Sequence, residues 1–233
     1  MKGILYLVPN VIAEGRTEVI PASVISLLPS IHNFLAEDVR TARRYLSSLK
    51  VYPRIEALKF EVLNKDTNPQ QLHELMKPLQ EGENIGVISE SGCPGVADPG
   101  ALAVKYAHEH RIQVVPLVGP SSILLALMGS GLNGQRFAFH GYLPIDVKEA
   151  AKTIKDLERE SQAKGQTQIF IETPYRNNQI IDHLLNHLKA STLLTIATDM
   201  TGDHERLDTK PVAEWRANKP TLGKLPTVFC FLA

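Results

Sequence analysis

Short apolar runs alternate with segments of helical length along the first half of the chain. The runs have the length of strands and end at polar, Pro or Gly positions: residues 3–9, 33–37, 58–63, 84–88 and 112–118. The segments between them are typical of helices: residues 21–28, 39–49, 69–80, 101–110 and 121–128. This alternation predicts a mostly parallel sheet with right-handed crossover connections.

The pattern starts afresh in the second half. Strands are expected at residues 136–142, 167–172, 192–198 and 225–232. Helices are expected at residues 147–164 and 177–188. A hairpin-like region around residues 205–208 adds an antiparallel element, so the second sheet should be mixed. We therefore predict an α/β protein of two α/β domains: residues 1–118 with a mainly parallel sheet, and residues 119–233 with a mixed sheet.

Composition limits the classes of function. The chain has 233 residues, 43% of them apolar, and 25 basic against 25 acidic side chains. Zero formal charge argues against a protein that coats nucleic acid by bulk electrostatics, but it allows a local basic patch. Cys93 and Cys230 are too few for a disulfide framework. The first apolar run is too short for a secretory signal, so we expect a cytoplasmic protein without a membrane span. No zinc-binding spacing occurs, and no metal site is expected.

The most informative segment is residues 89–100, Ser-Glu-Ser-Gly-Cys-Pro-Gly-Val-Ala-Asp-Pro-Gly. It lies between a predicted strand and a predicted helix, where open α/β sheets bind ligands. Its glycines let a ligand approach the backbone closely, and its prolines fix the shape of the loop. A loop of this length in a small domain indicates function. The plainer alternative is a long turn that starts the next helix at Pro99.

Residues 115–122 also join a strand to a helix. Ser121 and Ser122 can cap that helix, whose free N–H groups can receive an oxygen-rich ligand. A plain capped helix fits this segment equally well.

Charged residues mark two further strand ends. In residues 36–44, Glu37 and Asp38 precede three arginines on or near one helix face, which suits a phosphate backbone or, more simply, a solvated face with intrahelical ion pairs. In residues 169–176, a glutamate, a tyrosine and an arginine follow a buried strand. Glu172 and Arg176 either contribute to an interdomain cleft or form an internal ion pair.

Taken in order, five segments resemble the tetrapyrrole methylase superfamily of S-adenosylmethionine (SAM)-dependent methyltransferases. Within it they are most similar to the branch that methylates the ribose 2′-oxygen of a cytidine in small-subunit ribosomal RNA. Each segment is weak alone, but their order and spacing are specific, and the resemblance covers nearly the whole chain. The segments are Ala36-Glu37-Asp38-Val39-Arg40, residues 89–100, residues 115–122, Gly141-Tyr142-Leu143-Pro144 and residues 169–176.

The resemblance implies two α/β domains with SAM bound in the cleft between them, usually in a homodimer. It also implies RNA or the small ribosomal subunit as a partner. Carried over by position, the first group of cofactor contacts would be Pro9, Gly92, Cys93, Pro94, Val96, Ala97, Ser121 and Ser122. Those of the second domain would be Thr173, Tyr175, Ala197, Pro226 and Thr227.

The sequence departs from the RNA-methylating branch at several positions. The first strand runs into Pro9-Asn10-Val11 instead of a threonine-proline-isoleucine-glycine-asparagine-leucine loop. Glu90 stands for an aspartate, Cys93 for a threonine, and Tyr175 for the histidine of a histidine-arginine pair. These changes fall more on the substrate side than on the cofactor framework.

Methyl transfer from SAM is an in-line displacement by a substrate nucleophile. A ribose hydroxyl needs a base to take its proton as it attacks. The candidates for that base are Glu37, Asp38 and Glu90. The candidates for holding phosphate are Arg40, Arg43 and Arg176. With zero net charge, any RNA affinity should be modest, local and dependent on RNA structure.

Three alternatives remain open at this point. The acceptor could be a tetrapyrrole ring carbon, although the Ala-Glu-Asp-x-Arg and Gly-Tyr-Leu-Pro segments favour the RNA branch. It could instead be a protein or another small molecule. The chain could also be a catalytically idle SAM-binding or RNA-binding module of ribosome biogenesis.

Overall fold

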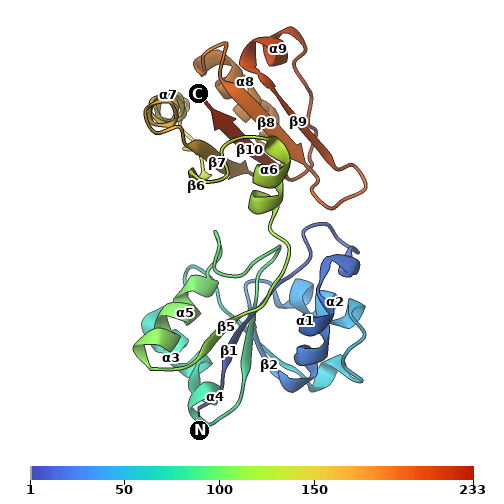
Figure 1. Cartoon of the computed structure of the whole chain (residues 1–233). Helices are drawn as coiled ribbons and strands as arrows, with labels where there is room; N and C mark the ends of the chain where they lie inside the picture. The colour runs from blue at the N-terminus through green and yellow to red at the C-terminus, as the bar shows by residue number, and fades with distance from the viewer. Residues whose placement is uncertain (1) are drawn as a thin grey trace. The chain divides into compact units, whose positions relative to one another are not determined.

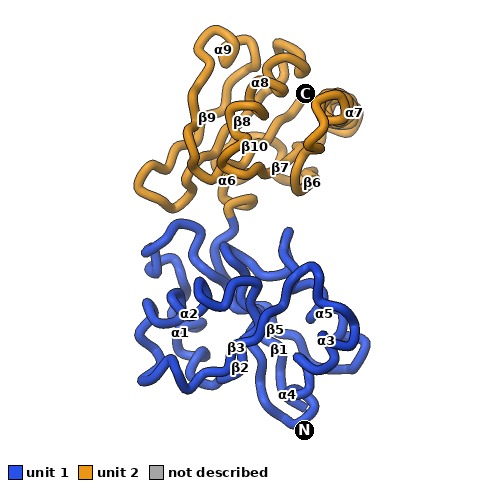
Figure 2. Tube along the Cα trace, turned by 180° about the vertical axis from the view of Figure 1, so that it is seen from behind, with its two compact units in different colours: residues 1–121 blue, residues 122–233 orange. Residues whose placement is uncertain are grey.

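The computed structural model describes residues 2–233. The chain divides into two compact units, Met1–Ser121 (unit 1) and Ser122–Ala233 (unit 2), coloured separately in Figure 2. The division falls between Ser121 and Ser122, whereas the sequence pattern places the boundary between residues 118 and 119. Within the described residues, no helix is long and apolar enough to cross a membrane.

Unit 1 is built on a five-stranded parallel sheet in the order β3-β2-β4-β1-β5. All carboxyl ends of its strands therefore lie at one edge of the sheet. Each of the five apolar runs of the first half forms one strand, as predicted. The strands are β1 (Leu5–Val8), β2 (Asn33–Ala36), β3 (Lys59–Val62), β4 (Ile85–Ile88) and β5 (Val114–Pro116).

Helices cover both faces of this sheet (Figure 1). On one face α1 (Ala22–Leu27) and α2 (Val39–Ser48) pack on Val8, Phe34 and Ile88. On the other, α3 (Pro69–Leu75), α4 (Lys77–Gln80) and α5 (Gly100–Glu109) pack on Leu5, Leu35 and Val87. Neighbouring strand residues thus face opposite layers, as the period of two in a strand requires. Three short 3-10 helices complete the unit: Thr17–Val19, Leu28–Ser30 and Ile55–Ala57.

The helix predicted at residues 69–80 is divided in the structure. It is divided at Met76, and Pro78 stands in the first turn of the second piece. A proline has no backbone N–H and is tolerated only in a first turn, so one continuous helix is unfavourable here. The first piece begins with a capping box, in which the side chains of Asn68 and Gln71 each bond the other residue's backbone N–H.

Unit 2 has a mixed sheet in the order β6-β7-β10-β8-β9. The first two strands pair in parallel, and the other neighbouring pairs are antiparallel. The mixed sheet predicted for the second half is confirmed. It contains more antiparallel strand pairs than the single late hairpin that the sequence predicts. The strands are β6 (Phe137–Tyr142), β7 (Thr167–Glu172), β8 (Leu193–Thr198), β9 (Arg206–Pro211) and β10 (Thr227–Leu232).

Two apolar layers cover this sheet (Figure 1). One face packs against α7 (Val147–Lys164), α8 (Asn177–His187) and α9 (Val212–Ala217), around Phe170 and Phe229. The other face, which includes Ile169, Val228 and Cys230, packs against α6 (Ser122–Ser130). The two helices predicted at residues 147–164 and 177–188 both form, and α9 is an additional one.

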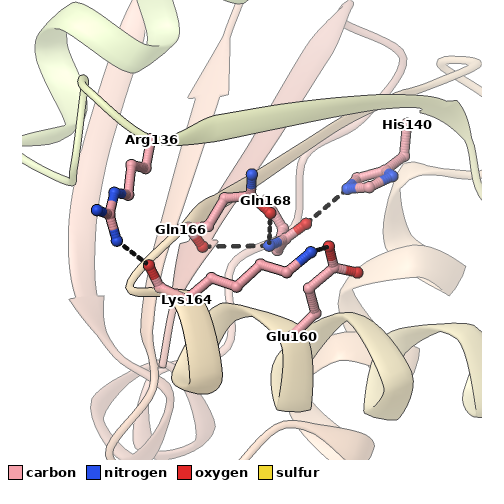
Figure 3. Close-up of polar contacts among 6 residues, drawn as sticks. All are labelled: Arg136, His140, Glu160, Lys164, Gln166 and Gln168. Atoms are coloured by element: carbon pink, nitrogen blue, oxygen red, sulfur yellow. Dashed lines mark hydrogen bonds and ion pairs between the residues drawn. The ribbon is translucent and has the colours of Figure 1, made fainter.

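Polar contacts hold the edge strand β6 to β7 and to the end of α7 (Figure 3). His140 Nε2 lies 2.6 Å from Gln168 Oε1, and Gln168 Nε2 donates to the carbonyl of Gln166 at 3.2 Å. Arg136 donates to the carbonyl of Lys164 at 3.2 Å. His140 thus has a structural partner on the neighbouring strand.

A buried carboxylate fastens α7 to the segment that leads into β8. Glu158 is buried, and its Oε1 accepts hydrogen bonds from the backbone N–H of Lys189 at 2.7 Å and from Thr192 Oγ1 at 2.5 Å. Buried polar groups that lose their partner are costly, so this contact should matter for stability.

We expect Glu158→Ala to lower the free energy of unfolding by about 1–3 kcal/mol, because two donors lose their acceptor. The measurement is denaturant unfolding followed by circular dichroism. The matched control is Glu160→Ala on the same helix, which removes only a surface ion pair with Lys164 and should leave stability close to that of the wild type. Equal losses in both variants would contradict the role given to Glu158.

Candidate functional site

The loops after β1 and β4 are paired at the carboxyl edge of the unit 1 sheet. The backbone N–H of Asn10 donates to the carbonyl of Gly92 at 2.9 Å, and that of Gly92 donates to the carbonyl of Val11 at 3.4 Å. The side-chain amide of Asn10 donates to the carbonyls of Ser89 and Glu90 at 3.0 and 3.1 Å. Asn10 is 2% exposed, so these bonds are largely shielded from water.

The loop after β5 joins the same assembly. A Cβ atom on Gly119 would lie 2.1 Å from Cβ of Pro9, so only glycine permits this approach. The Cys93 thiol lies 3.3 Å from the carbonyl oxygen of Pro120, as a donor to it. The hydroxyl of Tyr45, on α2, donates to the carbonyl of Pro9 at 2.6 Å. Three loops that are distant in sequence are thereby held as one surface.

The loop after β4 is also braced internally. Asp98 Oδ1 accepts from the backbone N–H groups of Gly95 and Gly100, each at 2.8 Å. Gly92 and Gly95 have φ values of 66° and 83°, which a glycine adopts without strain. Ala97 has φ 53°, a conformation that an alanine holds only at some cost. The loop therefore has a defined shape that exposes Val96 and Ala97.

The structure brings the three predicted candidates for the base into one acidic group. Partial burial raises the pKa of Glu90, and the nearby carboxylates of Glu37, Asp38 and Asp98 raise it further. Asp38 caps α2: its side chain accepts from the backbone N–H of Thr41 at 2.6 Å, which lowers the pKa of Asp38. Glu90 and Glu37 are exposed at the strand ends.

The predicted phosphate-binding arginines of α2 are exposed. The guanidinium of Arg43 lies 5.0 Å from the centroid of the Phe60 ring, and Arg44 pairs with Glu14 at 3.3 Å. Arg40 is close enough to Asp38 to contribute to its lowered pKa. The helix thus presents guanidinium groups beside the acidic group.

In unit 2, four of the residues predicted to contact the cofactor lie at one edge of the sheet. Thr227 opens β10 and lies opposite Glu172 of β7 and Thr198 of β8. Ala197 pairs with Val228 one residue further in. Thr173 follows β7 directly and Pro226 precedes β10 directly.

Arg176 has internal partners. Its Nη1 lies 3.2 Å from Oε2 of Glu172, whose side chain is 1% exposed, and its Nη2 donates to the carbonyl of Pro144 at 3.2 Å. Glu172 Oε1 accepts from the backbone N–H of Thr173 at 2.7 Å. Of the two alternatives for this pair, the internal ion pair is the one observed. The hydrogen bond from Arg176 to Pro144 ties the loop after β7 to the loop after β6.

Several features of these sites carry little or no signal in the sequence. Asn10 is a single polar residue after a strand, and only its position there hints at a role. The contact of Gly119 with Pro9 joins residues far apart in the chain.

Of the described residues, no three His, Cys, Asp or Glu side chains lie close enough together to hold a metal ion.

The unit 1 edge is suited to a largely apolar ligand with a few polar atoms. It offers backbone groups, small side chains and a thiol that burial keeps neutral by raising the pKa of Cys93. A combination of apolar surface and a few polar atoms is typical of cofactor sites.

We expect Gly119→Ala to destabilise the protein by about 1–3 kcal/mol, because the added methyl group overlaps Pro9. Thermal and denaturant unfolding measure the loss. The control is Gly134→Ala, where an added Cβ meets no heavy atom within 4 Å and stability should change little. A Gly119→Ala protein as stable as the control would mean that the two loops are not in close contact.

Comparison with known proteins agrees with this architecture. The family model described as Tetrapyrrole (Corrin/Porphyrin) Methylases matches residues 15–215. A protein named ribosomal RNA small subunit methyltransferase I from Escherichia coli O157:H7 is 33% identical over 214 residues, which are 91% of this chain and 71% of that protein. A protein of the same name from Vibrio cholerae is 31% identical over 91% of this chain and 69% of its own length.

Solved structures share the fold. The methyltransferase CobJ superposes with a TM-score of 0.65 at 15% identity, covering 100% of this chain and 94% of its own. Uroporphyrin III C-methyl transferase from Thermus thermophilus superposes with a TM-score of 0.59 at 16% identity, covering 99% and 97%. The family match over residues 15–215 and the relatives named as methyltransferases identify the chain, whose fold the solved structures share, as a methyltransferase of the tetrapyrrole methylase family.

Proposed function

We propose that this methyltransferase uses SAM to methylate a ribose 2′-oxygen in RNA of the small ribosomal subunit. The observation that carries the proposal is the joined surface of the loops after β1, β4 and β5, fastened by the Asn10–Gly92 backbone bond of 2.9 Å. The names of the relatives from Escherichia coli and Vibrio cholerae support the ribosomal acceptor.

The residues of the unit 1 edge fit SAM. Gly92 and Gly119 let its loops pack against one another, because an added Cβ would meet the Pro120 carbonyl oxygen and Pro9, and its neutral thiol does not oppose a cationic sulfonium. When bound, SAM supplies a methyl group on a sulfonium leaving group. We assign the contacts of unit 1, and of Ser122 directly after it, to the positions predicted from the resemblance: Pro9, Gly92, Cys93, Pro94, Val96, Ala97, Ser121 and Ser122. In unit 2 we assign Thr173, Ala197, Pro226 and Thr227.

Among the acidic residues, Glu90 is the best base. A base works best when its pKa approaches the working pH, and the pKa of Glu90 is raised. Asp38 is engaged in capping α2, and the hydrogen bond from Thr41 weakens it as a proton acceptor. Glu37 contributes negative charge that raises the pKa of Glu90.

The arginines of α2 are suited to holding the RNA backbone. Arg40 and Arg43 are exposed on the helix that starts beside the acidic group. Guanidinium groups bind phosphate oxygens in pairs of hydrogen bonds. Arg176 is less suited, because it already pairs with Glu172 and Pro144.

The family resemblance also leads us to propose a cytoplasmic homodimer. Light scattering after size-exclusion chromatography tests the oligomeric state: twice the mass of one chain supports the dimer, and a single-chain mass contradicts it.

The direct test is transfer of labelled methyl groups from SAM to 30S subunits that lack the modification, with naked RNA as a parallel substrate. We expect transfer to the subunits, and nuclease digestion should recover the label as a 2′-O-methylated nucleoside. Label in a tetrapyrrole or protein fraction would favour another acceptor. SAM binding without transfer to any cellular fraction would favour a non-catalytic module.

We expect Glu90→Gln to slow methyl transfer by about 10²–10⁴-fold with little effect on SAM affinity, since a general base contributes that much. Single-turnover rates and calorimetric SAM titration measure the two effects. Full turnover in this variant would remove Glu90 from the mechanism.

The pH profile provides a second check on the same residue. The active form of Glu90 is the carboxylate, so the rate should fall as the pH falls through its raised pKa. Glu37→Gln removes a negative charge that raises this pKa, so it should move the acidic limb of the profile to lower pH while keeping most of the maximal rate. A Glu37→Gln protein without activity would instead make Glu37 the base.

A further inference from the structure

Exposed apolar and aromatic side chains gather at the edge of unit 2 where β6 and β7 end. Tyr175 is 81% exposed, Ile145 80% and Tyr142 54%. Large apolar groups are usually withdrawn from water, so several exposed ones on neighbouring loops indicate an interaction site. We call Tyr142, Ile145, Tyr175 and Lys224 the Tyr175 platform.

The platform is one surface because its loops are neighbours. Its strands are adjacent in the order β6-β7-β10. The bond from Arg176 to the carbonyl of Pro144 fastens the loop that carries Tyr175 to the loop that carries Ile145. Lys224 comes from the loop before β10, and its Nζ lies 5.1 Å from the centroid of the Tyr175 ring.

The lysine and the tyrosine are not accounted for by the packing of unit 2. Tyr175 lies outside the buried core clusters, and Lys224 has no carboxylate within ion-pair distance among residues 2–233. A lysine ammonium 5.1 Å from the centroid of an exposed aromatic ring combines a stacking surface with a positive charge. This is the combination by which proteins bind unpaired nucleotides: bases stack on the ring, and the cation meets the backbone.

We propose that the Tyr175 platform binds an unpaired nucleotide of the acceptor RNA, with its base stacked on Tyr175 and an adjacent phosphate held by Lys224. The inference rests on the proposed function and assigns a second RNA contact, on unit 2. It replaces the cofactor role predicted for Tyr175. The 81% exposure of its ring suits a surface contact better than the enclosed setting typical of a cofactor pocket.

The test compares Tyr175→Leu, Tyr175→Phe and Lys224→Gln in the full chain. Three quantities are measured for each: binding to unmodified 30S subunits by co-sedimentation, KM for the subunits in methyl transfer, and Kd for SAM by calorimetry. Lys152→Gln, which removes an exposed charge from α7, is the matched control. Circular dichroism melting confirms that each variant is folded.

We expect Tyr175→Leu to weaken subunit binding and raise KM by about 10-fold, since stacking of one base contributes that much. Tyr175→Phe should restore most of the loss, because the ring and not the hydroxyl group carries the stacking. Lys224→Gln should weaken binding and lower the salt dependence by about one unit of slope. The SAM affinity of all variants, and all properties of Lys152→Gln, should match the wild type.

Specific results would overturn the inference. Unchanged subunit binding in Tyr175→Leu rejects the platform, and an equal loss in Tyr175→Phe rejects stacking. A loss confined to SAM affinity makes Tyr175 a cofactor contact. If the wild type binds subunits without methylating them, the proposed function fails. The difference in subunit binding between the wild type and the Tyr175 and Lys224 variants then still shows whether the platform binds RNA. If it neither binds nor methylates them, both are rejected.

Discussion

The short contact between the loops after β1 and β4 is the constraint on which the unit 1 site depends. Both loops leave adjacent parallel strands at the same edge, so their backbones run close enough to bond. Asn10 then uses its own backbone and side chain to fix the loop of residues 89–100. Once this loop is fixed, Cys93 can meet the loop after β5, and Glu90 is held beside Glu37 and Asp38.

Unit 2 places its loops by a different means. Its edge is organised by the buried carboxylate of Glu172, which bonds Thr173 and pairs with Arg176. A buried charge without a partner is strongly unfavourable, so the arginine is retained by the fold and is not free to reach a ligand. The consequence is that the positive charge available at this edge comes from Lys224. The basic groups proposed to hold phosphate therefore come from different elements in the two units, α2 in unit 1 and the loop before β10 in unit 2.

Much of this fold follows from sequence pattern, and the exceptions have physical causes. Most strands were predictable because they are short apolar runs between turn residues, whereas β9 is largely polar and showed only as a hairpin-like region. The division of the helix at Met76 depends on Pro78, whose effect is local and outweighs a good helical pattern. Helix α9 has six residues, too few to show a helical period. At the site, Glu37, Asp38 and Glu90 could be placed from the sequence, because each lies at or just after the end of a predicted strand. The capping by Asp38 and the ion pair of Arg176 depend on side-chain geometry, to which residue spacing gives only an approximate guide.

Cys93 gives the site a property that a threonine at the same position would lack. The thiol is half-buried among backbone carbonyls, and its pKa is raised, so very little thiolate is present at neutral pH. Oxidants and electrophiles react chiefly with the thiolate, which makes this cysteine slow to damage. The other cysteine, Cys230, is buried in the unit 2 sheet, where burial raises its pKa to about 12. The folded chain therefore carries one slowly reacting thiol in the loop of residues 89–100, and its rate of alkylation would report whether a ligand covers that loop.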